Sequence, residues 1–541
     1  MKRLSGILLT GALLLAIGAL NAATLMAETA PGRTMARQAV GKNTPWITTD
    51  HSGHEILKQP FSSGSEVTKA CLSCHNEAGS QVMKTIHWTW RDPNSKDEEM
   101  IGKAGLTLNN FCISIHGNEP RCTSCHAGYG WKDKSFDFTD ETKIDCLVCH
   151  DQTGTYKKFP TKAGHPVTKP TKFGGKTFTP PDWNAVAQSV ALPTRQNCGT
   201  CHFFGGGGDG VKHGDMDSSL FSPTKALDVH MDAQGKDFNC TRCHTTVAHD
   251  ISGRTYRTPA FETRKSLVED DMTHKITCVS CHTATPHKAG SKPNDHTDVV
   301  ACQTCHIPTF AREKPTKMWW DWSKAGVKKG GKPYVEKGDF GKPVYMTKKG
   351  DMRWEKNVKP EYFWYNGSIE TLTAKDAVNP ATEIAVNRPL GDRRDENARI
   401  FPFKVHRAKQ PMDAVSKTLA IPHLFGKKGS DAYWKTYDWE KAVASGMEKA
   451  GLPFSGELEF VETSYVFPIT HMVAPKEQTV ACSECHTRQG GRLQKAEMRT
   501  FYMPGRDTGG PMEASAWGLV IASLLGVFIH GVVRAVTHKK R

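Results

Sequence analysis

Two long runs of apolar residues lie at the ends of the chain. The first extends from Leu4 to about Leu20 behind Lys2 and Arg3, and small residues follow as far as Ala27. A basic start, an apolar stretch and small residues in this order predict a secretory signal peptide over residues 1–27, cleaved near Ala27. An uncleaved membrane anchor is the alternative.

The second run, AWGLVIASLLGVFIHGVV, extends from Ala516 to Val533. As a helix it would be roughly 27 Å long, enough to cross a thin bilayer. Trp517 suits the outer interface, and the basic residues from Arg534 to Arg541 suit the cytoplasmic side. The pattern predicts a single-pass anchor over 516–533 that holds the rest of the chain in the periplasm, with a buried soluble helix as the alternative. His530 lies inside this span, where an ionisable residue indicates a functional role, although a simple helix contact would also explain it.

The chain between these ends has little amphipathic periodicity. Residues 431–451 alternate at the helical period, and Gly451 is a plausible stop. Only 38% of all residues are apolar, and there are 48 Gly and 30 Pro. The mean hydropathy is −0.50. Side chains alone would therefore give a thin core, so we expect short helices joined by long irregular connections.

The cysteine spacing changes this interpretation. Sixteen of the 17 cysteines fall into eight Cys-x-x-Cys-His pentads, and Cys112 is left over. In chain order the pentads comprise Cys71, Cys74 and His75; Cys122, Cys125 and His126; Cys146, Cys149 and His150; Cys198, Cys201 and His202; Cys240, Cys243 and His244; Cys278, Cys281 and His282; Cys302, Cys305 and His306; Cys482, Cys485 and His486.

This spacing is typical of covalent haem attachment. Two thiols three positions apart can bond the two vinyl groups of one haem, and the following imidazole can bind its iron. A zinc site would pair one Cys-x-x-Cys with another and would not require His after each. A disulfide framework would not repeat one local spacing eight times. The pentads therefore predict eight covalently bound c-type haems, and the signal peptide agrees with haem attachment outside the cytoplasm.

Eight porphyrins would supply the apolar core that the side chains lack. The expected fold is mainly α with extensive irregular loops and little sheet, wrapped around eight haems. We expect a haem region with seven pentads over 28–310, a haem-free, loop-rich segment with short hairpins over 311–425, and a helical region with the eighth haem over 426–512.

The net charge of +15 invites a nucleic-acid or anionic-membrane interpretation. However, the propionates of eight haems would supply roughly −16, which nearly cancels the excess. The lysines therefore serve mainly to neutralise propionates, a basic funnel for a small anionic substrate is the secondary interpretation, and no nucleic-acid partner is expected.

Each low-spin haem needs a second strong ligand besides its pentad histidine. Seven other histidines stand near a pentad or on a short predicted helix, with His406 and His423 in reserve and Met ligation open for one or two haems. These seven are His87, His230, His249, His274, His287, His296 and His471. Seven candidates for eight haems suggest that one haem differs from the others.

The eight pentads and the long gap before the last resemble the octahaem tetrathionate reductase family of multihaem c-type cytochromes. The strings NNFCIS with NEPRCTSCHAGYGW, and CHFFGGGGDGVKHGD, look like that family's active-site segments. The resemblance implies a catalytic second haem held by Lys212 on its distal side, with Asp209 and Cys112 beside it. His116 and His213 flank these positions and are candidate proton donors.

Simpler roles remain open for these residues. Lys212 could pair with a propionate, Cys112 could be an inert buried thiol, and both histidines could be structural. Two functions follow. One is a periplasmic reductase that delivers several electrons to a small sulfur or nitrogen oxyanion such as tetrathionate or nitrite, or to hydroxylamine. The other is a non-catalytic electron-transfer module that links a quinol-oxidising membrane cytochrome to other redox proteins.

Overall fold

A computed structural model of the protein describes most of the chain, in two compact units divided between Thr479 and Val480. The described residues are 31–32, 34–35, 49–92, 95–96, 98, 100–253, 277–507 and 510–538. The predicted signal peptide and His274 lie outside them.

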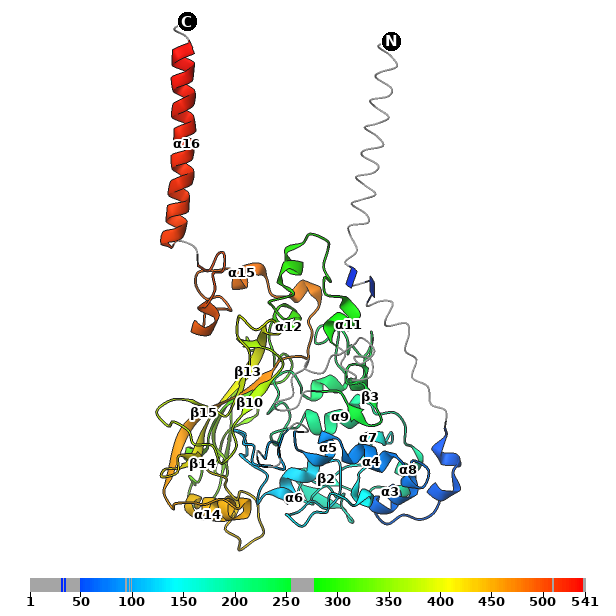
Figure 1. Ribbon diagram of the computed structural model, residues 1–541. Helices are drawn as coiled ribbons and strands as arrows, with labels where there is room; N and C mark the ends of the chain where they lie inside the picture. The colour runs from blue at the N-terminus through cyan, green and yellow to red at the C-terminus, as the bar shows by residue number, and fades with distance from the viewer. Residues whose placement is uncertain are drawn as a thin grey trace, which may run out of the picture. The chain divides into compact units, whose positions relative to one another are not determined.

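The N-terminal part of the first unit consists of short helices joined by turns, as expected (Figure 1). Residues of the pentads lie on α3 (Gly64–Leu72), α6 (Glu119–Cys122), α7 (Leu147–His150), α9 (Arg195–His202) and α11 (Cys278–His282). Two 3-10 turns, η4 (Thr123–Cys125) and η7 (Cys240–Arg242), and helix α12 (Cys302–His306) carry others. Between them lie α4 (Ala78–Met83), α5 (Ile86–Thr89), α8 (Trp183–Gln188) and two hairpins, β1–β2 (Thr171–Phe173, Lys176–Phe178) and β3–β4 (Thr246–Val247, Asp250–Ile251).

The following part of the first unit forms a large sheet, which corrects the expectation of little sheet. Nine strands take part: the order is β11-β15-β13-β5-β8-β7-β6, and β9 and β14 also pair with β13. The strands are β5 (Thr316–Asp321), β6 (Val335–Lys337), β7 (Pro343–Met346), β8 (Gly350–Glu355), β9 (Glu361–Tyr365), β11 (Ile384–Ala385), β13 (Arg399–Asp413), β14 (Thr418–Leu419) and β15 (Leu458–Pro468). A small pair, β10 (Ile369–Thr371) and β12 (Asn387–Pro389), lies outside it.

The central strand β13 explains why the sheet was missed. It pairs with β15 over eleven residues, yet its sequence RIFPFKVHRAKQPMD does not alternate between apolar and polar residues. Lys404, His406 and Gln410 are fully buried, and two prolines interrupt the strand. A strand is recognised in a sequence when apolar and polar residues alternate and when proline is absent. The sequence of β13 has neither property.

The helix predicted over 431–451 is present in two pieces, α13 (Tyr433–Thr436) and α14 (Trp439–Ala450). Tyr437 takes a left-handed conformation with φ of 58°, which ends α13, and Asp438 caps α14 by accepting from the Lys441 amide. Gly451 ends α14 with φ of 74°, as expected of a C-terminal glycine.

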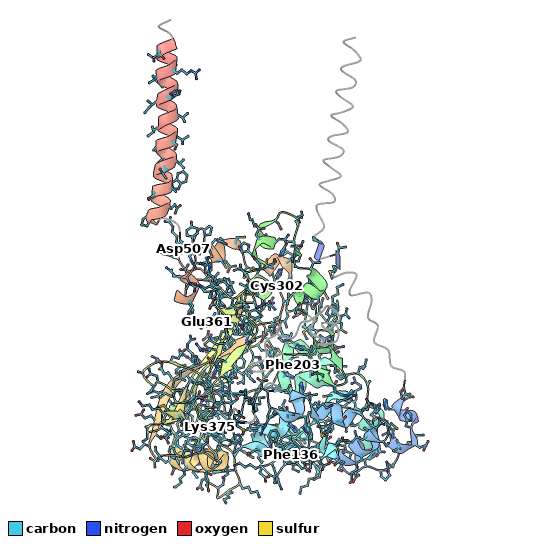
Figure 2. The ribbon with its side chains drawn as sticks, in the orientation of Figure 1. Phe136, Phe203, Cys302, Glu361, Lys375 and Asp507 are labelled. Atoms are coloured by element: carbon cyan, nitrogen blue, oxygen red, sulfur yellow. The ribbon has the colours of Figure 1, made fainter. Side chains whose placement is uncertain are left out.

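Side chains of the first unit, among them Phe136, Phe203 and Glu361, are drawn in Figure 2.

The second unit contains the last pentad and the apolar helix. It comprises α15 (Cys482–Cys485), the 3-10 turn η11 (Ala496–Arg499) and α16 (Pro511–His538). Among the described residues, α16 is the one helix long and apolar enough to cross a membrane, over Glu513–Thr537. None of its apolar window is buried, which agrees with the predicted anchor rather than with a core helix.

Candidate haem sites and active site

Six pentad histidines in the first unit face a second imidazole ring. The distances between ring centroids all lie between 6.0 and 6.4 Å. The facing pairs are His75 with His51, His202 with His87, His150 with His249, His282 with His230, His244 with His471, and His306 with His287.

This spacing fits a pair of axial ligands on one iron. Imidazole nitrogens bind a metal at about 2 Å, so two rings on opposite sides of one iron have centroids roughly 6 Å apart. The hydrogen bonds of three pentad histidines agree with this. His150 donates from Nδ1 to the carbonyl oxygen of Ala191, His244 to that of Ser252, and His486 to that of Pro504. A donated Nδ1–H leaves Nε2 as the coordinating atom and orients the ring.

Five of the facing residues are among the seven predicted distal ligands: His87, His230, His249, His287 and His471. The sixth, His51, was missed. It opens a 3-10 turn, His51–Gly53, that is capped by Asp50, twenty residues before the first pentad. The string HSGH, with two histidines close together ahead of the pentad, was a usable signal.

Neither reserve histidine faces a pentad imidazole among the described residues. His406 Nδ1 contacts Asn110 Oδ1 at 2.8 Å, and His423 Nδ1 contacts Ser445 Oγ at 3.1 Å. His296 donates from Nδ1 to the carbonyl oxygen of Lys292 at 2.9 Å and stays a predicted ligand.

Thiols from different pentads also lie together. The thiols lie close enough to shift each other's pKa in four pairs: Cys71 with Cys146, Cys125 with Cys201, Cys198 with Cys240, and Cys278 with Cys302. Electrostatic contacts add Cys149 with Cys198 and Cys243 with Cys281. The pentads therefore form a connected series. The first pentad neighbours the third, the third to the seventh follow one another in chain order, and the second pentad neighbours the fourth.

The second pentad differs from the other six in the first unit. Among the described residues, the rings around His126 are aromatic side chains rather than a second imidazole: Trp88, Trp90, Trp131, Phe136 and Phe138. His126 Nε2 donates to the Trp88 carbonyl oxygen at 2.6 Å, and its Nδ1 is buried without a hydrogen-bond partner. Within the described part of the first unit, His126 is thus the pentad histidine that no second imidazole faces.

Lys212 lies beside this pentad, at the end of a glycine-rich turn. Gly206 and Gly207 take φ of 76° and 93°, which favours glycine. A Cβ on Gly206 would come within 2.9 Å of Val211, 3.3 Å of Phe111 and 3.4 Å of the Lys212 Cβ. The tight turn therefore packs Lys212 close to the segment that carries Cys112.

The surroundings of Lys212 favour its neutral form. Burial, reinforced by the charge of Lys103, lowers its pKa to about 7, and it also interacts with the Cys125 thiol. Its Nζ lies 5.5 Å from the Phe467 ring centroid. His213 packs against the same ring at 5.0 Å, and burial followed by the Lys212 charge holds its pKa well below the usual value. A neutral amine has a lone pair for a metal, whereas an ammonium has none.

Two of the predicted site residues are bonded elsewhere. The Asp209 carboxylate accepts from the Ser218 amide at 2.8 Å and from Lys314 Nζ at 2.8 Å. His116 donates from Nε2 to the Gly105 carbonyl oxygen at 2.7 Å, and burial lowers its pKa. These contacts hold both side chains in place, which agrees with the structural role left open for His116.

Strand β13 holds the segments of both Lys212 and Cys112. Lys404 Nζ donates to the carbonyl oxygens of Val211 at 3.0 Å and Lys212 at 2.9 Å. Two residues further on, His406 stacks on Phe111 at 4.1 Å. Asn110 Nδ2 donates to the His406 carbonyl oxygen at 2.7 Å. The sequence pattern indicates no role for Lys404, because β13 lacks the alternation of a strand.

Two further lysines surround Cys112. Lys317 is almost fully buried, its Nζ lies 3.4 Å from the Trp320 ring centroid, and burial holds its pKa well below the usual value. Burial also lowers the pKa of Lys349. Both lysines interact electrostatically with the Cys112 thiol. Cys112 therefore lies beside the amines of two largely buried lysines.

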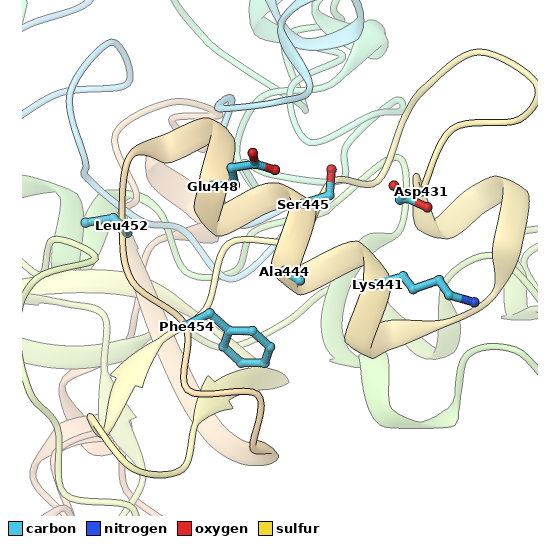
Figure 3. A pocket seen from close by; sticks show the side chains of 7 residues that line it. All are labelled: Asp431, Lys441, Ala444, Ser445, Glu448, Leu452 and Phe454. Carbon is cyan, nitrogen blue, oxygen red and sulfur yellow. The ribbon is translucent and has the colours of Figure 1, made fainter.

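A surface hollow over α14 lies apart from these residues (Figure 3). Its lining includes Asp431, Lys441, Glu448 and Phe454 but neither His nor Cys. It is therefore no haem site.

Comparison with known proteins agrees with this arrangement. Three family models match: "Cytochrome c554 and c-prime" over residues 70–151, "Cytochrome c7 and related cytochrome c" over 225–312, and "Cytochrome c bacterial" over 317–489. An uncharacterised protein from Archaeoglobus fulgidus is 24% identical over 254 residues, which is 40% of this chain and 84% of that protein.

The crystal structure of an octahaem cytochrome c from Shewanella oneidensis superposes with a TM-score of 0.74 at 43% identity. The match covers 86% of this chain and 99% of that one. This likeness supports c-type haem as the cofactor and a multihaem oxidoreductase or electron-transfer role. The chain belongs to the octahaem tetrathionate reductase family of multihaem c-type cytochromes.

Proposed function

We propose that the protein is a membrane-anchored periplasmic reductase with eight haems, one on each pentad, and that its catalytic haem is the second. The observation that carries this is the contrast between His126 and its six counterparts. Six pentad histidines of the first unit face an imidazole, whereas His126 lies among aromatic rings and Lys212 interacts with Cys125 of the same pentad. We assign Lys212 as the distal ligand there and the six facing histidines as distal ligands of the other haems in the first unit, and His296 stays a predicted ligand.

Lys212 is suited to a labile ligand. In its neutral form the amine would be able to hold the haem, which would supply electrons when bound. In its protonated form the ammonium would stabilise an anionic substrate. A pKa of about 7 makes both forms accessible near neutral pH. His213, in contact with the same Phe467 ring, is placed to exchange that proton.

The lysines around Cys112 favour a small oxyanion as substrate. Lys349 can add positive potential in a poorly solvated region, and Lys317, whose pKa burial holds well below the usual value, can donate a hydrogen bond from its amine. Tetrathionate fits this setting: its reduction breaks one S–S bond, takes up two electrons and yields two thiosulfates without consuming protons. Nitrite and hydroxylamine need protons as well, and His213 is placed to relay them from the ammonium form of Lys212.

Lys212→Ala tests this proposal, with exposed Lys225→Ala as the matched control. We expect the variant to keep its full haem content, to convert one haem to an open or water-ligated form in the EPR spectrum, and to lose more than tenfold in tetrathionate turnover driven by reduced methyl viologen. The control should match the wild type. An unchanged spectrum and turnover in Lys212→Ala would instead favour the non-catalytic electron-transfer module.

A further inference from the structure

The second unit combines a haem pentad and an apolar helix in a short stretch of chain. Its pentad histidine, His486, donates from Nδ1 to the carbonyl oxygen of Pro504 at 2.7 Å. The neighbouring Gly505 has φ of 79°, and a Cβ there would lie 2.7 Å from the His486 carbonyl oxygen. The segment that leads into α16 therefore packs directly against the residue that would bind the eighth haem.

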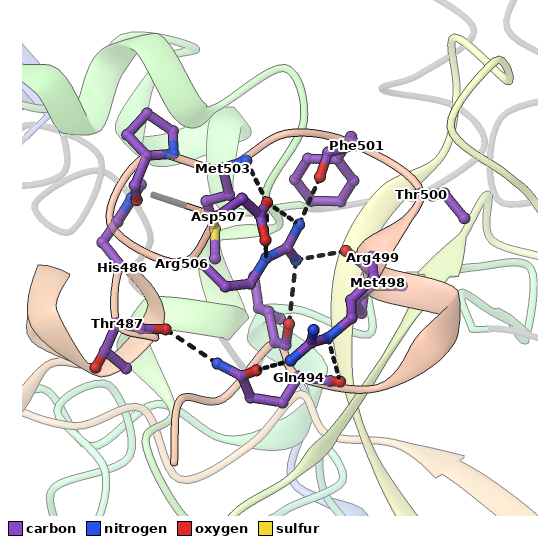
Figure 4. A network of polar contacts seen from close by, with 12 residues as sticks. His486, Thr487, Gln494, Met498, Arg499, Thr500, Phe501, Met503, Arg506 and Asp507 are labelled. Carbon is purple, nitrogen blue, oxygen red and sulfur yellow. Dashed lines mark hydrogen bonds and ion pairs between the residues drawn. The ribbon is translucent and has the colours of Figure 1, made fainter. Parts of the chain in front are cut away.

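Arg506 fixes this segment (Figure 4). Only 5% of its surface is exposed. Its guanidinium donates to the carbonyl oxygens of Leu493 at 3.1 Å, Met498 at 2.6 Å and Phe501 at 2.5 Å, and pairs with Asp507 at 2.6 Å. Donors shared among several carbonyl groups hold the loop in one conformation.

A second arginine ties the same loop to the pentad helix. Arg492 pairs with Glu484 of α15 at 2.8 Å, and its backbone amide donates to the Glu484 carbonyl oxygen at 2.8 Å. Residues 480–507 therefore form a small module, which we call the eighth-haem module, held together by Arg492 and Arg506.

Chain length limits how far this module can lie from the bilayer. The apolar stretch of α16 begins at Glu513, nine residues after Pro504. Nine residues span at most about 30 Å. Pro504 accepts a hydrogen bond from His486, the residue that would bind the eighth haem. The eighth haem would therefore lie within about 30 Å of the membrane surface in any orientation of the module. The other pentads are at least 170 residues earlier in the chain and have no comparable tether to the helix.

We propose that the eighth haem is the point where electrons enter the protein, and that the donor is a quinol-oxidising protein in the membrane that α16 crosses. This inference rests on the proposed function, since it supplies the electrons for that reductase. The donor oxidises a quinol to a quinone, releases two protons and passes two electrons to ferric haem. Confinement of donor and acceptor to one membrane raises their effective concentration and favours transfer to the tethered haem.

The test uses the full chain in membrane vesicles from its native cells, with duroquinol as the electron source. Replacing both Cys482 and Cys485 by Ala removes the covalent attachment of the eighth haem. We expect the mass to fall by one haem, dithionite to reduce the remaining haems, and duroquinol to reduce them more than tenfold more slowly than in the wild type. A duroquinol rate within twofold of the wild type, or no reduction of the wild type by duroquinol, would overturn the proposal.

A milder variant keeps the haem. Gly505→Ala should displace the Pro504 carbonyl from His486, weaken the donation that makes the imidazole basic, and raise the midpoint potential of one haem. Gly490→Ala is the matched control, because Gly490 has φ of 67° in the same module but no atom within 4 Å of its Cβ position. Equal potentials in the two variants would refute the role of the Pro504 contact. Tetrathionate turnover of the wild type with methyl viologen tests the proposed function separately, so the two can fail independently.

Discussion

The Nζ of Lys404 donates a hydrogen bond to the backbone carbonyl oxygen of Lys212 at 2.9 Å. One fully buried lysine thus holds the backbone of another whose side chain is the proposed haem ligand. Lys404→Met keeps the length of the side chain but leaves the Val211 and Lys212 carbonyl groups without this donor. We expect the turn to loosen, the EPR signal of the Lys212-ligated haem to broaden, and turnover to fall at least fivefold.

Lys409→Met is the control for this prediction. Lys409 lies on the same strand, five positions away, so its side chain points to the opposite face. We expect wild-type spectra and turnover in this variant. A uniform loss of all haem signals in Lys404→Met would mean general destabilisation and would contradict the positioning role.

His51 provides a second prediction. His51→Ala should leave haem content unchanged and convert one low-spin ferric signal to high spin, because His75 would lose the ring that faces it 6.2 Å away. His54→Ala is the control, since His54 lies 6.0 Å from His51 in the same segment. The prediction fails if both variants, or neither, change the spectrum.

The buried carboxylate Asp145 gives a prediction for alkaline pH. It accepts from Tyr129 at 2.7 Å and from Tyr156 at 2.9 Å and pairs with Lys158 at 2.9 Å. Burial, followed by the Asp145 charge, raises the pKa of both tyrosines well above 10.0. Above about pH 10 the unfolded chain loses these protons while the folded chain keeps them, so stability should fall by up to about 1.4 kcal/mol per pH unit for each tyrosine.

Guanidine unfolding between pH 8 and 11 measures this slope. Tyr156→Phe should reduce the pH dependence of the free energy of unfolding by the contribution of one tyrosine. Tyr502→Phe, which alters an exposed ring, should leave this pH dependence unchanged. Equal slopes in the wild type and Tyr156→Phe would show that the cluster does not control alkaline stability.

Removal of residues 511–541 tests the anchor. Because α16 exposes its apolar surface, the full chain should need detergent for extraction, whereas the shortened chain should be released by osmotic shock with its haems bound. Release of the full chain without detergent would contradict the anchor.

The sequence predicted local chemistry better than long-range structure. Cys-x-x-Cys-His is complete within five residues, so all eight pentads could be read directly, and Gly451 ends its helix as its position indicates. By contrast, β13 was missed because its buried positions hold Lys404, His406 and Gln410, whose partners come from segments about 90 to 300 residues away. His51 was missed because the pairing of histidines depends on distance in space, and the string HSGH offered only a weak local signal for it.

The facing histidines also bear on how the chain matures. His244 and His471 are more than two hundred residues apart, and His87 and His202 more than one hundred. A metal bound by both histidines of a pair closes a long loop of chain, which lowers the conformational entropy. The free energy of metal binding offsets this loss only when the metal is present. Before haem insertion, this chain should therefore resemble a metal-free zinc finger: locally structured, globally loose, and thus still able to pass through a translocation pore.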